Sequence, residues 1–222
     1  MARTYHQHCS LAHALDLVGD RWTLLIAREL LSGPRRYVDL ASGLVSAPSN
    51  LLSDRLRQME ERGLVSRRAL DAPAQSVVVY ELTELGAGLA EPLAALSRWG
   101  MQTMPPREDR TFQSHWLVVA LHARFDPSAA HGVTEAYEFR IDGDDTVHFA
   151  VTDGEGTAGV GPAPFEPAVV ITAAPDTFLE LSAGAIAPLE AIGRGAVLEG
   201  DDVAFERMGR ILPVKPPLES AA

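Results

Sequence analysis

The sequence predicts an α+β protein of two domains, one in each half of its 222 residues. Residues 1–104 carry eleven arginines and eleven acidic residues and are neutral, whereas residues 105–222 carry eight basic and nineteen acidic residues and hold the whole net charge of −11. All seven phenylalanines lie at or beyond Phe112. Paired prolines follow a long helical pattern near this change, which is typical of a hinge. We therefore expect one domain over 1–104 and a second over 112–213.

The first half opens with three short amphipathic helices, expected over residues 10–18, 21–31 and 37–42. Ser10 and Asp20 can cap the first two helices. Glycines, and one Gly-Pro pair, punctuate the connections between them. Leu11, Leu15 and Val18 share one stripe of the first helix. The side chains expected to be buried in the next two helices are Trp22, Leu25, Ile26, Leu30, Tyr37, Leu40 and Ala41.

A fourth helix is expected to begin at Pro48 and to end at Gly63. At 100° per residue, three apolar side chains share one face within about 60°, namely Leu52, Leu56 and Met59. The opposite half carries Asn50, Ser53, Asp54 and Arg57. Small hydrogen-bonding side chains near the start of a helix can reach base edges in a major groove without holding the backbone away. We therefore expect this helix to read double-stranded DNA, with Arg55 and Arg57 where it leaves the groove and meets phosphate.

Two strands are expected next, over 65–70 and 77–82, joined by the turn-rich run DAPAQS. The first strand carries Arg67 and Arg68. A basic hairpin that follows a reading helix is typical of a wing, which lies along the minor groove or the DNA backbone. The order of these elements predicts a winged helix-turn-helix domain.

A last long helix is expected from Thr83, which can cap it, to about Met101. Its apolar stripe consists of Leu85, Leu89, Leu93, Leu96 and Trp99. A helix of this length extends beyond a small core, so its apolar stripe must be buried against another surface. A second copy of the chain is the natural candidate, so we expect a homodimer.

Five motifs resemble the HxlR-type family of bacterial transcriptional regulators, in order and with natural spacing over residues 9–100. They are CSLAHALDLVGDRWTLLI, RELLSGPRRY, LLSDRLRQMEERGLV, YELTELG and the pair WG. The resemblance implies homodimers that bind inverted repeats, with the helix at 48–62 as the reader.

The expected DNA contacts are of two kinds. Arg35 and Arg36, at a helix start, could hold a phosphate together with backbone amides, although a solvated arginine pair is the alternative. Asn50 and Ser53 are expected base readers, and Asp54 can accept from a cytosine amine or pair with Arg57. The full set is Arg35, Arg36, Ser46, Ser49, Asn50, Ser53, Asp54, Arg55, Arg57, Arg67, Arg68 and Gln75. Because the second half is acidic and repels phosphate, affinity must come from such local groups.

Cys9 is the single cysteine, which excludes an intrachain disulfide. A thiol near a helix N-terminus has a lowered pKa and reacts readily. Several HxlR-type regulators are similar in using an N-terminal cysteine to sense oxidants or electrophiles, so Cys9 is a redox candidate; the alternative is an unreactive cysteine at the dimer seam. His6, His8, Cys9 and His13 together suggest a metal site, because Cys9 and His13 are four residues apart, the spacing of two ligands on one helical face. Histidines are common in frayed termini, and we expect neither a metal nor a cofactor.

The second half predicts an α+β domain with a mostly antiparallel sheet. Strands are expected over 133–141, 146–152, 169–172 and 195–198, with helices over 175–182 and from Asp201 to Leu212. Periodicity does not decide between strand and helix over 112–125.

The runs VVITAAPDTFLEL and GRGAVLEGDDVAFERM resemble the sterol carrier protein fold, over about residues 115–213. The resemblance implies an apolar cavity between sheet and helices for a lipid or another small hydrophobic molecule. The side chains that could line it are Trp116, Tyr137, Phe139, Phe149 and Phe178. The alternative is that these aromatic rings fill the core.

No catalytic motif is present: the chain has neither a glycine-rich phosphate loop followed by lysine nor a Gly-x-Ser-x-Gly elbow, so we expect no enzyme. No apolar run approaches the roughly 20 residues that span a bilayer. The N-terminus lacks the apolar core of a signal peptide, so a cytoplasmic protein without membrane contact is expected.

The sequence thus predicts a homodimeric regulator, by family analogy a repressor, that binds an inverted-repeat operator. A small apolar ligand in the second domain would change its DNA affinity. Two alternatives stay open. Cys9 could be the switch, or the chain could carry a hydrophobic ligand and not bind DNA.

Overall fold

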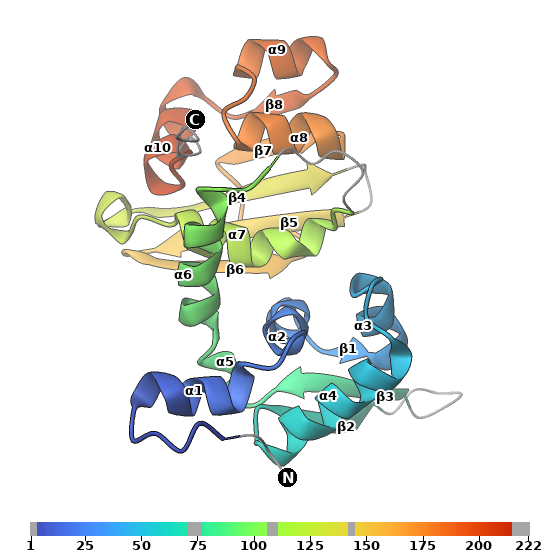
Figure 1. Cartoon of the computed structure of the whole chain (residues 1–222). Coiled ribbons are helices and arrows are strands. Elements are labelled where there is room, and N and C mark those ends of the chain that lie inside the picture. The colour runs from blue at the N-terminus through green and yellow to red at the C-terminus, as the bar shows by residue number, and fades with distance from the viewer. Residues whose placement is uncertain (1–3, 71–76, 106–110, 142–144, 215–222) are drawn as a thin grey trace, which may run out of the picture. The chain divides into compact units, whose positions relative to one another are not determined.

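The computed structural model describes residues 4–70, 77–105, 111–141 and 145–214 (Figure 1). They fall into two compact units, residues 1–93 and 94–222, whose boundary lies within one helix. Within the described residues, no helix is long and apolar enough to cross a membrane.

The first unit combines helices with a three-stranded sheet (Figure 1). Its helices are α1 (Ser10–Val18), α2 (Thr23–Leu31), α3 (Tyr37–Gly43), α4 (Ser49–Glu61), α5 (Glu84–Ala87) and the start of α6 (Ala90–Met101). Its strands are β1 (Arg35–Arg36), β2 (Val65–Leu70) and β3 (Val77–Leu82), arranged β1-β3-β2. The antiparallel pair β2–β3, with Val65 opposite Leu82, confirms the predicted wing strands. A third strand, β1, was not predicted because two arginines carry no strand pattern.

The core of the first unit contains the expected apolar face of α4. Leu52, Leu56 and Met59 are fully buried, together with Ile26 and Leu40 from α2 and α3. Leu25, which was expected on the inner face of α2, is 39% exposed, so that prediction was wrong.

Three predicted helix boundaries in this unit were also wrong. The N-cap of α1 is Cys9, and Ser10 is already the first residue of the helix. Helix α2 begins at Thr23, after Trp22 with φ +80°, and Asp20 does not cap it. The long final helix is divided into α5 and α6. Thr83 does cap α5, accepting from the Gly86 amide at 3.1 Å, but α5 ends at Ala87, with Gly88 as its C-cap. Glycine is a poor helix former, and two glycines so close together favour this break.

The second unit has a five-stranded sheet with the order β6-β5-β4-β7-β8. The β4–β7 pair is parallel and the other pairs are antiparallel, as expected of a mostly antiparallel sheet. The strands are β4 (Thr134–Ile141), β5 (Asp145–Thr152), β6 (Glu155–Val160), β7 (Val169–Ala173) and β8 (Val197–Glu199). Strand β6 escaped prediction because its glycines and small residues hide the alternation.

Helical segments cover the apolar face of this sheet. They are η1 (Ser114–Trp116), α7 (Leu117–Arg124), η2 (Pro127–Ala130), α8 (Pro175–Ser182), α9 (Pro188–Gly193) and α10 (Asp202–Ile211). The ambiguous segment 112–125 is therefore mainly helical. Asp201 caps α10 as expected, accepting from the Ala204 amide at 2.7 Å.

Tyr137 belongs to the apolar core of the second unit and is fully buried. Its hydroxyl donates to Oε2 of Glu135 at 2.9 Å, and Glu135 pairs with Arg207. Burial raises the pKa of Tyr137 to about 12, because the phenolate would lose its hydration.

This pKa predicts a loss of stability in alkali. The stabilising effect of the neutral phenol is complete below the unfolded pKa of about 10 and is lost as pH rises through the folded value. We expect Tyr137→Phe to reduce the fall in unfolding free energy between pH 10 and 12 by about 2–3 kcal/mol. Urea unfolding at several pH values measures this, with Tyr80→Phe as the matched control. If the unfolding free energy falls equally steeply with pH in the wild type and in Tyr137→Phe, this prediction is contradicted.

Candidate nucleic-acid interface

The outer face of α4 is polar and exposed. Ser49, Asn50, Ser53, Asp54 and Arg57 all point away from the buried face of the helix. Among the described residues, no hydrogen-bond partner of the Asn50 amide is found, so both its donor and its acceptor are available. This is the bidentate pattern that matches an adenine edge.

A hydroxyl cluster lies at the start of α4. The Tyr37 hydroxyl donates to the Ser49 carbonyl at 2.9 Å, and Ser53 Oγ donates to the same carbonyl at 3.0 Å. Ser53 Oγ is also 3.2 Å from the Tyr37 hydroxyl. Because the Ser53 hydroxyl already donates its proton to a backbone carbonyl of α4, it is better suited to accept a hydrogen bond from DNA than to donate one. Tyr37 was missed as a site residue because it was expected to be buried; its place beside Arg36 was the available signal.

Four exposed arginines of the first unit are held by carboxylates. The four sets are Arg36 with Asp39 at 2.8 Å, Arg57 with Asp54 at 3.3 Å and Glu61 at 2.9 Å, Arg67 with Glu60 at 2.6 Å, and Arg68 with Glu81 at 3.0 Å. The hydrogen bond from Arg36 lowers the pKa of Asp39, and that from Arg68 lowers the pKa of Glu81. Each of these arginines therefore already has a carboxylate partner, which fits the balanced charge of this half.

Arg35 and Arg36 occupy β1 and the start of α3. Asp39 accepts from both the Arg36 amide and its guanidinium, so a carboxylate holds the position expected for phosphate. Arg35 is half-buried and donates from Nη2 to Ser32 Oγ at 3.0 Å. Ser46 is exposed in the α3–α4 loop. Gln75 lies outside the described residues.

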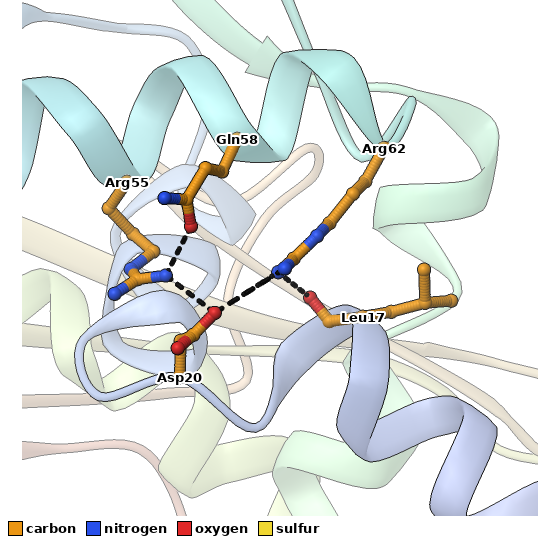
Figure 2. Close-up of polar contacts among 5 residues, drawn as sticks. All are labelled: Leu17, Asp20, Arg55, Gln58 and Arg62. Carbon is orange, nitrogen blue, oxygen red and sulfur yellow. Dashed lines mark hydrogen bonds and ion pairs between the residues drawn. The ribbon is translucent and has the colours of Figure 1, made fainter. Parts of the chain in front are cut away.

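Arg55 departs from its expected role. It was expected at the DNA backbone, but its residue is only 8% exposed. Its guanidinium turns away from the outer face of α4 toward Asp20, where Nη1 lies 2.6 Å from Oδ2 (Figure 2). A guanidinium placed on the Leu52–Leu56 side of the helix is drawn to the nearest carboxylate because it has lost water. Arg55 is therefore removed from the expected phosphate contacts.

Cys9 is the N-cap residue of α1 and is exposed. Hydrogen bonds with the backbone of Ala12 and Leu11 lower the pKa of its thiol, which favours the thiolate. Among the described residues, no group of three or more His, Cys, Asp or Glu side chains is placed to hold a metal ion.

The aromatic residues proposed for a ligand cavity lie in the core of the second unit. Tyr137, Phe139, Phe149 and Phe178 are all buried in one cluster. The Phe139 and Phe178 rings meet edge to face at 5.7 Å. Trp116 is half-buried and contacts Phe112 edge to face at 6.5 Å. These contacts serve the packing of the core.

Residues 17–108 match the family model described as HxlR-like helix-turn-helix. The regulator YvaP of Bacillus subtilis is 32% identical over 94 residues, which cover 42% of this chain and 85% of YvaP. The chain belongs to the HxlR-like helix-turn-helix family.

Other relatives match this HxlR-like region at similar lengths. An uncharacterized HTH-type transcriptional regulator of Mycobacterium tuberculosis is 41% identical over 99 residues, or 45% of this chain. The match spans only 61% of that relative's own length. The solved structure of the reduced form of the B. subtilis regulator YodB is 29% identical and matches with a TM-score of 0.39, covering 45% of this chain and 98% of YodB.

Proposed function

We propose that this protein is a homodimeric transcriptional repressor, acting in the cytoplasm, that binds an inverted-repeat operator. The observation that carries the proposal is the pairing of α4 with the wing. A polar exposed face with Asn50 and Arg57 stands over a fully buried apolar face, and a hairpin with Arg67 and Arg68 follows directly. Membership in the HxlR-like family supports this reading of the two elements.

A dimer is supported by helix α1. Of its nine residues only Ala12 is buried, while Leu11 and Leu15 are 66% and 40% exposed. Isolated helices of this length are marginal in water, so α1 gains stability by packing against another surface. Dimerisation would also place two α4 helices at the fixed spacing that an inverted repeat requires.

We further propose that a small apolar ligand binds the second unit and changes the DNA affinity. The support is a second compact unit with a large apolar core, together with the resemblance of its sequence runs VVITAAPDTFLEL and GRGAVLEGDDVAFERM to the sterol carrier fold. A ligand can change the DNA affinity only if it binds one conformation of the protein more tightly than another. The probe is a fluorescent fatty acid, added to the full chain with and without operator DNA. Binding that leaves DNA affinity unchanged would contradict the coupling.

The DNA-binding proposal is tested by gel shift on DNA flanking the protein's own gene. Arg57→Ala should weaken binding to all sequences and reduce the salt slope by about 1, because one phosphate contact is lost. Asn50→Ala should cost about 1–3 kcal/mol, mostly at one base position. The matched control is Arg210→Ala, an exposed arginine of α10 in the second unit.

Two results would sink the proposal. One is the absence of a salt-sensitive, sequence-selective shift by the wild type. The other is an equal effect of all three variants. A protein that binds the fatty-acid probe but no DNA at low salt would be a ligand carrier.

A second candidate function makes Cys9 the switch. The specific observation is an exposed thiol at the N-cap of α1 with a lowered pKa. YodB, which is 31% identical over 94 residues, has also been solved in a diamide-treated form. If Cys9→Ser is released from DNA by diamide as readily as the wild type, this candidate fails.

A further inference from the structure

A polar network joins α1, the α1–α2 turn and α4 (Figure 2). Asp20 Oδ2 lies 2.6 Å from Arg55 Nη1 and 3.4 Å from both terminal nitrogens of Arg62. Arg62 Nη1 also donates to the Leu17 carbonyl at 2.7 Å, in the last turn of α1. Arg55 donates in turn to the side-chain oxygen of Gln58. One carboxylate outside α4 therefore holds two arginines, one from the middle of α4 and one at its C-cap.

The two arginines of this network are largely shielded from water, whereas the carboxylate that they share is partly exposed. The side chains of Arg55 and Arg62 are 9% and 15% exposed, and that of Asp20 is 42% exposed. Solvent and salt weaken exposed pairs, whereas a buried guanidinium that loses its carboxylate is left uncompensated. Among the described residues, Asp20 is the one carboxylate recorded in an ion pair with Arg55. This contrasts with Arg57, whose exposed pairs lie within α4 itself.

The turn that carries Asp20 has a fixed shape. A Cβ at Gly19 would lie 2.5 Å from the Leu15 carbonyl oxygen, so the turn requires glycine there. Trp22 has φ +80°, a left-handed conformation that tryptophan adopts only when its surroundings impose it. The segment between α1 and α2 is therefore not a free linker, and a movement of α1 carries Asp20 with it.

We infer that Asp20 is a positioning residue through which the placement of α1 sets the placement of α4, and thereby the affinity for DNA. The inference rests on the proposed function, in which α4 reads DNA. Helix α1 carries Cys9 at its N-cap and the exposed Leu11 and Leu15. A partner bound to this helix, or a modified thiol at its start, thus acts on α4 through Arg55 and Arg62.

The test is Asp20→Asn in the full-length protein. We expect operator binding to weaken about tenfold, within the usual range for coupled sites, with no change in the salt slope because no phosphate contact is lost. Amide hydrogen exchange in the free protein should become faster over 17–23 and 49–62. Asp20→Glu should restore part of the affinity.

The matched control is Asp16→Asn. Asp16 lies in α1 and accepts from Thr4 Oγ1 and the Tyr5 amide, both at 2.9 Å, on the segment before the helix. It should leave affinity and exchange in α4 as in the wild type. If Asp20→Asn does not fold, Arg62→Gln keeps the Asp20–Arg55 pair and removes the contact with Leu17. It should change both readouts in the same direction by a smaller amount.

The outcomes separate the two proposals. Wild-type exchange in α4 of a folded Asp20→Asn protein would overturn the link, whatever the DNA affinity. A lower melting temperature with unchanged affinity would also overturn it, because Asp20 would then only stabilise the fold. Faster exchange in α4 together with a wild type that binds no DNA would keep the link between the helices and refute the proposed function.

Discussion

Leu11→Glu is expected to convert the protein from a dimer to a monomer and to weaken operator binding about a hundredfold or more, since each monomer then reaches one half-site only. Leu11 is 66% exposed on α1 in the single chain and is covered by the second copy in the proposed dimer. Burying a carboxylate there would cost more dimerisation free energy than the leucine contributes. Sedimentation velocity and gel shift measure the two effects on the same preparations.

The control for this variant is Leu189→Glu. Leu189 lies in α9 of the second unit and is also strongly exposed, so the same chemical change is made away from α1. It should leave both the oligomeric state and the affinity unchanged. A Leu11→Glu protein that stays dimeric would show that α1 is not part of the interface.

Leu56→Ala is expected to destabilise the first unit by about 2–5 kcal/mol, because it removes a fully buried side chain and leaves a cavity under α4. The loss falls at the helix that we propose reads DNA, so affinity should also decline in the folded fraction. Chemical unfolding followed by circular dichroism gives the free energy.

Val38→Ala is the comparison within the same unit. Val38 is exposed on α3, and its truncation should change stability by no more than about 0.5 kcal/mol. Similar losses for Leu56→Ala and Val38→Ala would show that the apolar face of α4 is not the core of this unit.

The balanced charge of the first half is reflected in the ion pairs of its exposed arginines. Each of the exposed arginines 36, 57, 67 and 68 meets a carboxylate of the same unit. Exposed pairs contribute little stability, so in the complex that we propose phosphate can replace each carboxylate at small cost. The proposed reader would then discriminate by the placement of its groups more than by net attraction. This fits a reader that depends on base contacts such as those available to Asn50.

The sequence by itself determined the elements whose periodicity is strong and local. The buried face of α4 at Leu52, Leu56 and Met59, and the bounds of both wing strands, follow from spacing that only one regular structure satisfies. The family motifs then ordered these elements into one domain.

Only the tertiary structure decided where the long polar side chains point. Asp20 and Arg55 fit a helix cap and a phosphate contact in the sequence, yet they meet each other at 2.6 Å, 35 positions apart in the chain. Distant neighbours also decide three other features. They are the short β1, the break between α5 and α6, and the position of Tyr37, which is only partly buried and donates to the Ser49 carbonyl. A side chain with several rotatable bonds is placed by the charges and hydrogen-bonding groups that the fold brings to it, and local spacing contains no record of them.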